Sequence, residues 1–135
     1  MLVGVFLRDI LLDVVELALD SKCRTTGRKV RPGGNCTNTA AALSSLGRSG
    51  SSTAAVTTWL HARLGCAGDG DEAFATNAAK AGDFALLADK SIENELSTCY
   101  CIRDKATGSR TIIRHGDASE PTAESLGRAL RTAVS

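Results

Sequence analysis

The sequence predicts an α/β fold with a parallel sheet, and three observations support this prediction. Residues 2–7 form a short apolar run with β-branched and aromatic side chains, typical of a strand buried on both faces. Residues 39–47 follow a glycine-rich turn and have the composition of a helix. Residues 99–102 and 111–113 then predict two further short strands. Strands therefore occur both before and after helical sequence.

Length and charge limit the classes of protein that fit. A chain of 135 residues has room for one domain, and only 30 of its residues are Leu, Val, Ile or Phe, which predicts a lean core. The net charge of +1 gives no overall field that would attract nucleic acid or an anionic membrane. Charged residues soon interrupt the apolar start, so neither a membrane span nor a signal peptide is expected, and the expected location is cytoplasmic.

The first strand is followed by an acidic residue and then by a basic segment. Asp9 comes just after the carboxyl end of the predicted strand, where ligands collect in open α/β sheets. Residues 10–19 fit either a strand or a helix. Residues 21–31 are basic without any acid, which predicts an exposed strand or loop. No aromatic residues alternate with these charges, so a solvated face is expected rather than a nucleic-acid or phosphate site.

Two asparagines lie where the first helix is expected to begin. Gly33 and Gly34 form a turn that brings Asn35 and Asn38 to the N-terminus of helix 39–47. Asn or Thr side chains are the candidate N-caps, and Gly47 is the expected stop. Leu43 and Leu46 are expected on one side of this helix.

The rest of the chain alternates between polar segments and short elements. Residues 49–62 look like an insertion, and the glycine and aspartate cluster at 65–72 precedes an alanine-rich helix near 73–81. A turn at 103–109 joins the two late strands into a hairpin, and residues 121–134 predict a final amphipathic helix.

The cysteines and histidines give no strong sign of a reactive site. Five cysteines without a C-x-x-C pair indicate reduced thiols rather than disulfides or a zinc site. Cys99 and Cys101 are expected to pack in a strand as small hydrophobic residues. His61 and His115, which have no nucleophile near them in the sequence, are expected at the surface.

Four features occur in a characteristic order. They are the strand before Asp9, the run Gly33-Gly34-Asn35-Cys36-Thr37-Asn38 into a helix, the Gly65/Gly68/Asp69 cluster, and Gly108-Ser109-Arg110-Thr111. In this order they resemble the amino-terminal part of the PfkB (ribokinase-like) carbohydrate kinases, in particular the ketohexokinase and fructokinase branch. The resemblance implies that residues 1–135 form part of a ribokinase-like fold, with a small β lid from segments 10–31 and 99–113.

The resemblance also implies an activity and its partners. The family phosphorylates small sugars with ATP and Mg²⁺, and a ketohexose is the expected substrate here. The implied partners are the sugar and a second copy of the chain, which would form a dimer through the lid strands.

The residue chemistry at the predicted site suits a polyol. A carboxylate such as Asp9 accepts hydrogen bonds from neighbouring hydroxyls, amides donate and accept, and glycines leave room for close approach. The resemblance implies that Asp9, the Gly33-Gly34 turn, Asn35 and Asn38 bind the sugar, and that Arg110 reaches the sugar or the transferred phosphate. Taken one at a time, the same residues also fit turns, helix caps or surface charges.

The family's catalytic segment is not found in this sequence. Its Gly-Ala-Gly-Asp motif carries the base, whereas Asp69 in Ala67-Gly68-Asp69 matches an earlier cluster of the family. We therefore expect no catalytic residue among these 135, with the ATP site beyond the sequence and no activity from this chain alone. The alternative is a non-catalytic sugar-binding or regulatory remnant that acts through a partner chain.

Overall fold

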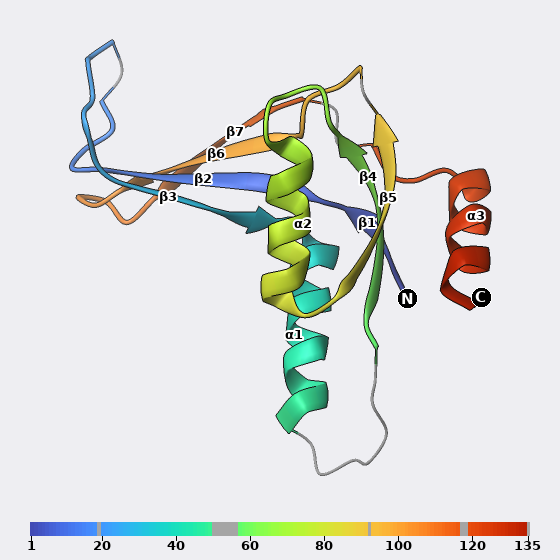
Figure 1. The fold of residues 1–135 in the computed structure, drawn as a ribbon. Helices are drawn as coiled ribbons and strands as arrows, with labels where there is room; N and C mark the ends of the chain where they lie inside the picture. The colour runs from blue at the N-terminus through green and yellow to red at the C-terminus, as the bar shows by residue number, and fades with distance from the viewer. Residues whose placement is uncertain (19, 50–56, 92, 117–118, 135) are drawn as a thin grey trace.

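The computed structural model describes residues 1–18, 20–49, 57–91, 93–116 and 119–134 (Figure 1). It contains two sheets and three helices among these residues. In chain order the elements are β1 (Leu2–Val5), β2 (Leu7–Val14), β3 (Thr25–Gly33), α1 (Asn35–Ser49), β4 (Trp59–Gly65), α2 (Asp71–Gly82), β5 (Ala85–Ser91), β6 (Thr98–Asp104), β7 (Arg110–His115) and α3 (Ala123–Val134).

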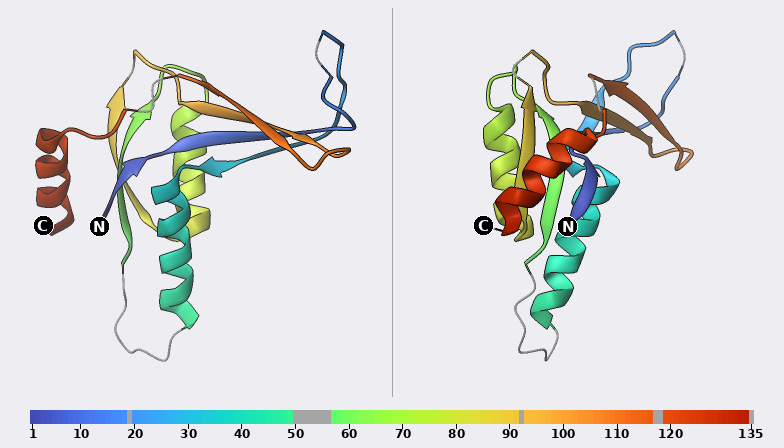
Figure 2. Two further views of the ribbon diagram at one scale, coloured as in Figure 1. Left: turned by 180° about the vertical axis from the view of Figure 1, so that it is seen from behind. Right: turned by 90° about the vertical axis from the view of Figure 1, so that its right-hand side faces the viewer.

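A small parallel sheet forms the centre of the molecule. Its strand order is β1-β4-β5, with Val3 opposite His61 and His61 opposite Leu87. Helices α1 and α2 lie on one side of this sheet and α3 lies on the other (Figures 1 and 2). The predicted α/β class with a parallel sheet and flanking helices is confirmed.

The core between this sheet and its helices is lean, as the composition predicts. Five of the ten buried residues in the main hydrophobic cluster are alanine. The larger members are Phe6, Leu60, Leu64, Phe84 and Leu96. Alanine side chains allow the helices to approach the sheet closely, so a small amount of apolar bulk fills the interior.

The central strand of this sheet, β4, begins within residues 49–62, the segment that the sequence analysis interpreted as an insertion. Residues 50–56 lie outside the described part, but β4 begins at Trp59, within the supposed insertion. Polar His61 and Arg63 interrupt the apolar pattern and hide the strand from sequence analysis. The prediction of a surface His61 is also wrong, because its ring is buried and hydrogen-bonds the Leu87 carbonyl and the Ser125 hydroxyl at 2.8 and 3.1 Å. His115 is exposed, as expected.

Helix α1 is longer than predicted, and the face that it buries does not contain Leu43 and Leu46. It begins at Asn35 and continues through Gly47 to Ser49, so Gly47 is not its stop. The backbone N–H of Asn38 donates to the backbone carbonyl of Gly34 at 3.0 Å. Gly34 therefore occupies the N-cap position, where an Asn or Thr was predicted. Leu43 and Leu46 are exposed. The small side chains of Thr37, Ala40 and Ser44 form the buried face, because α1 packs closely on β1.

The second sheet, which we call the lid, has strand order β3-β2-β6-β7 and extends away from the helices (Figure 2). Residues 10–19 fitted either a strand or a helix in the sequence analysis, and the structure shows that residues 10–14 belong to strand β2. The basic segment continues into exposed strand β3, and β6 and β7 form the predicted antiparallel hairpin. Among the described residues, no helix is long and apolar enough to cross a membrane.

Candidate functional site

Asp9 lies just beyond the carboxyl end of the central strand β1, as predicted, but it belongs to the lid strand β2. The chain leaves the central sheet at Phe6, which is buried and packs edge-on against Phe74 with ring centroids 6.3 Å apart. The Arg8 amide then donates to the Ser97 carbonyl at 2.9 Å, and pairing with β6 begins. Asp9 is the third residue of β2 and lies close to the junction between central sheet and lid.

A row of four residues crosses the lid at Asp9. The strand register places Arg31 of β3 opposite Asp9, Asp9 opposite Cys99 of β6, and Cys99 opposite Arg114 of β7. Residues paired in this way point to the same face of a sheet. The row therefore presents a carboxylate, a thiol and two guanidinium groups to one side of the lid.

That side of the lid faces a cleft of about 520 Å³. Its lining residues come from both sheets, from the start of α1 and from the segment before α3. They are Val3, Gly4, Val5, Leu7, Asp9, Arg31, Gly34, Asn35, Cys36, Asn38, Cys99, Cys101, Arg110, Ile112, Arg114 and Glu120. The volume falls in the range of sites for small molecules. Five of the six residues named from the sequence, namely Asp9, Gly34, Asn35, Asn38 and Arg110, come together here.

Gly33 is the sixth, and it contributes by leaving space for Asp9. It is buried, and a Cβ at Gly33 would overlap the Asp9 carboxylate. Gly34 has φ +96°, and a Cβ there would overlap the Val5 carbonyl oxygen. The two glycines therefore let the chain enter α1 directly beneath Asp9.

The two asparagines point into the cleft from the first turn of α1. Asn35 and Asn38 are both exposed, and their spacing places them on one side of the helix. Within the described parts of the chain, neither amide side chain has a hydrogen-bond partner. Both amides remain available to donate to and accept from a polyol.

The charge around Asp9 comes mainly from its neighbours in the row. Its carboxylate lies 3.5 Å from the guanidinium of Arg31, and its side chain is 18% exposed. Burial and the Asp9 carboxylate raise the pKa of the Cys99 thiol, while Arg114 opposes them. Cys99 and Cys101 are half-buried and face the cleft, so their expected place in a strand is correct but they line a site instead of a core.

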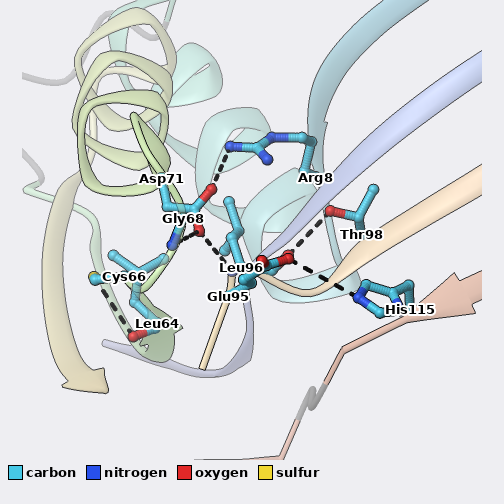
Figure 3. A network of polar contacts seen from close by, with 9 residues as sticks. All are labelled: Arg8, Leu64, Cys66, Gly68, Asp71, Glu95, Leu96, Thr98 and His115. Carbon is cyan, nitrogen blue, oxygen red and sulfur yellow. Dashed lines mark hydrogen bonds and ion pairs between the residues drawn. The ribbon is translucent and has the colours of Figure 1, made fainter. Parts of the chain in front are cut away.

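A separate polar cluster anchors the base of the lid (Figure 3). The Arg8 guanidinium donates to the buried Asp71 carboxylate at 2.8 Å and lies 4.7 Å from the centre of the Phe74 ring. Asp71 also accepts hydrogen bonds from the amides of Gly68 and Leu96, at 3.1 and 2.8 Å. This cluster joins β2, the start of α2 and the segment before β6 (Figure 3).

Sequence analysis missed several residues of these two sites. In the glycine and aspartate cluster it singled out Asp69, which is exposed, whereas Asp71 makes the contacts. The Gly68-x-x-Asp71 spacing before a helix is a signal that would have indicated Asp71. In the lid, Arg31 and Arg114 were passed over, although alternation along the strands places them on the face of Asp9.

The described residues do not form a metal-binding cluster. Within the described ranges, no three His, Cys, Asp or Glu side chains lie close enough together to hold a metal ion.

Comparisons with solved structures identify the fold. Phosphofructokinase-2 from Escherichia coli in complex with fructose-6-phosphate matches with a TM-score of 0.71 and 14% identity, over 98% of this chain and 40% of that one. Ribokinase from Thermotoga maritima gives 0.61 and 22% identity, over 84% and 35%. Ribokinase from Cryptococcus neoformans in complex with ADP gives 0.62 and 18%, over 84% and 32%.

These matches establish a partial ribokinase-like fold. The chain spans 35%, 40% and 32% of the lengths of these three proteins. No family model matches the sequence, and no curated protein matches it. The structural neighbours are ribokinase-family carbohydrate kinases, and they do not specifically favour the ketohexokinase branch.

Proposed function

We propose that this chain forms the sugar-binding part of an ATP-dependent carbohydrate kinase of the ribokinase type. The observation that carries the proposal is the convergence of Asp9, Asn35 and Asn38 on one cleft between the central sheet and the lid. The fold supports the same proposal, because its neighbours include ribokinase and phosphofructokinase-2.

In this proposal each residue has a distinct task. Asp9 accepts hydrogen bonds from two sugar hydroxyls, and charge-assisted bonds of this kind are stronger than neutral ones. The amides of Asn35 and Asn38 bind further hydroxyls and fix the orientation of the ring. The lid covers the bound sugar and removes it from water, so that the hydroxyl to be phosphorylated is held in place. ATP supplies the phosphoryl group in this reaction class.

The proposed acceptor is a small sugar, with a ketohexose as the first choice. The three remaining positions named from the sequence fit this assignment. Gly33 and Gly34 leave space for Asp9 and for the start of α1, and Arg110 lines the same cleft. The cytoplasmic location and the ketohexokinase-type substrate stay predictions.

A second copy of the chain is the proposed partner of the lid's opposite face. Successive residues of a strand point to opposite faces, so the residues between the cleft-facing ones lie on the lid's opposite face. Those that make this opposite face apolar are Ile10, Leu12, Val30, Tyr100, Ile102 and Ile113. Ile113 is 54% exposed, and a lid with two solvated faces would leave this apolar surface in water. Pairing of two such faces in a dimer would bury it. Sedimentation of the wild type and of Ile113→Lys tests the dimer, which the substitution should dissociate.

Calorimetric titration with ketohexoses tests the sugar site. We expect Asp9→Asn to weaken binding about tenfold or more, since a charge-assisted hydrogen bond is worth about 1.5–3 kcal/mol. Asp13→Asn is the matched control, because Asp13 is on the same face of β2 but pairs with Arg103 outside the cleft. Equal binding by the wild type and Asp9→Asn would contradict the proposal.

A further inference from the structure

Strand β3 forms one edge of the lid and leaves one side of its backbone open. It pairs with β2 on one side, and among the described residues no strand pairs with its other side. Figure 1 shows β3 extending past the helices toward the tip of the lid. Alternate residues of an antiparallel edge strand direct their backbone N–H and C=O groups outward, where a partner can bind them. Pro32 has no N–H, so the open edge is residues 25–31.

The open edge is surrounded by cations that lack carboxylate partners. Arg31 forms an ion pair with Asp9, and Asp13, the other carboxylate of β2, pairs with Arg103. Four further cations of residues 21–31 are exposed and form no ion pair within the described part of the chain. They are Lys22, Arg24, Arg28 and Lys29. The segment contains no acid of its own, so it attracts a negatively charged partner.

The positions of these cations favour a peptide strand over a nucleic acid. Arg28 and Lys29 are adjacent in β3, so their side chains point to opposite faces of the lid. An added strand also presents side chains to both faces, and it can place an acid beside each cation. A nucleic-acid backbone lying along one face would reach only one of the two. No aromatic residue lies within 21–31 for bases to stack on.

A second copy of this edge would be repelled. Pairing of β3 with β3 would bring the same cations together, and like charges directly opposite each other destabilise a sheet. We propose that the open edge of β3 binds an extended acidic segment of a partner protein, which adds a strand to the lid. Because the outward backbone groups point along the plane of the sheet, the added strand lies beside the lid and covers neither of its faces. The inference is therefore independent of the proposed sugar site.

Calorimetric titration and amide hydrogen exchange of the 135-residue chain test this proposal with a synthetic peptide. The peptide is as long as β3, is rich in valine and threonine, and carries glutamates on both faces of its strand. We expect saturable binding that weakens as salt is added, and slower exchange of backbone amides within residues 25–31. The control peptide has the same sequence with alternate amides N-methylated, which keeps its charge but prevents strand pairing. It should bind much more weakly.

Substitutions test the charges separately. Arg28→Gln combined with Lys29→Gln should weaken binding of the peptide about threefold or more, since both cross-strand charge pairs are lost. Lys80→Gln combined with Arg131→Gln is the matched control, because it removes one exposed lysine and one exposed arginine from α2 and α3. The control variant should bind the peptide as the wild type does.

Three results would overturn the proposal. Equal binding of the N-methylated peptide would show that charge alone holds the peptide, without an added strand. Equal binding by the wild type and the Arg28→Gln, Lys29→Gln variant would remove the role of the cations. Tighter binding of a single-stranded oligonucleotide than of the peptide, weakened by the same two substitutions, would assign the edge to nucleic acid instead.

Discussion

Replacement of Asp71 by alanine is expected to destabilise the junction between lid and core more than any substitution in the cleft. The Asp71 side chain is 3% exposed and has three hydrogen-bond donors around it: the Arg8 guanidinium and the amides of Gly68 and Leu96. Alanine would leave a partly buried guanidinium without its carboxylate. It would also leave the buried amide of Leu96 without an acceptor.

The magnitude follows from these losses. Breaking a buried ion pair by removal of one partner costs about 3–5 kcal/mol. Arg8 retains 24% exposure and its contact with the Phe74 ring, which favours the lower part of that range. We therefore expect the free energy of unfolding to fall by about 3 kcal/mol in Asp71→Ala. Asp71→Asn keeps one oxygen as an acceptor and should lose less.

Urea unfolding followed by circular dichroism and by Trp59 fluorescence measures this change. Asp69→Ala is the matched control, because Asp69 is exposed in the same loop and should stay within about 0.5 kcal/mol of the wild type. Hydrogen exchange at the Leu96 amide should become faster in Asp71→Ala only. A loss below about 1 kcal/mol in Asp71→Ala would refute the role given to this cluster.

Three further predictions concern other parts of the chain. Ser44→Ala should raise the thermal midpoint, because the buried Ser44 hydroxyl has no hydrogen-bond partner among the described residues; a lower midpoint would contradict this. Gly34→Ala should destabilise the chain by about 1–3 kcal/mol in urea, and an unchanged midpoint would contradict the strained turn. Backbone amides of Leu17 and Thr107 lower the pKa of Asp104, so its stabilising effect should be lost below about pH 3.9, and Asp104→Asn should flatten that acid transition.

Much of the fold could be predicted because its signals are local. The apolar run before Asp9, the alanine-rich segment of α2 and the β6–β7 hairpin each carry their pattern within a few residues. The central strand β4 could not be found in this way. Its buried His61 is satisfied by Leu87 and Ser125, which are distant in sequence, so a polar residue stands where a strand pattern requires an apolar one.

The sequence predicted several of the residues that line the cleft, but not how the chain brings them together. Asp9, Asn35 and Asn38 were identified from residue types and order, and they do meet. The bend at Phe6 that moves Asp9 into the lid depends on packing against Phe74, which the sequence near Asp9 does not reveal. Arg114 enters the site only through the register of four strands, and that register is a property of the whole sheet.

The most direct test of the sugar cleft is amide chemical-shift mapping of the chain by NMR during titration with fructose. The account predicts that the largest shifts occur at residues 7–9, 33–38, 99–101 and 110–114, which surround the cleft. It also predicts that Asp9→Asn needs about tenfold or more ligand to reach the same shifts. Shifts confined to α3 and the cavity beside His61, or no saturable shift at any of the cleft residues, would contradict the assignment of this cleft to a sugar.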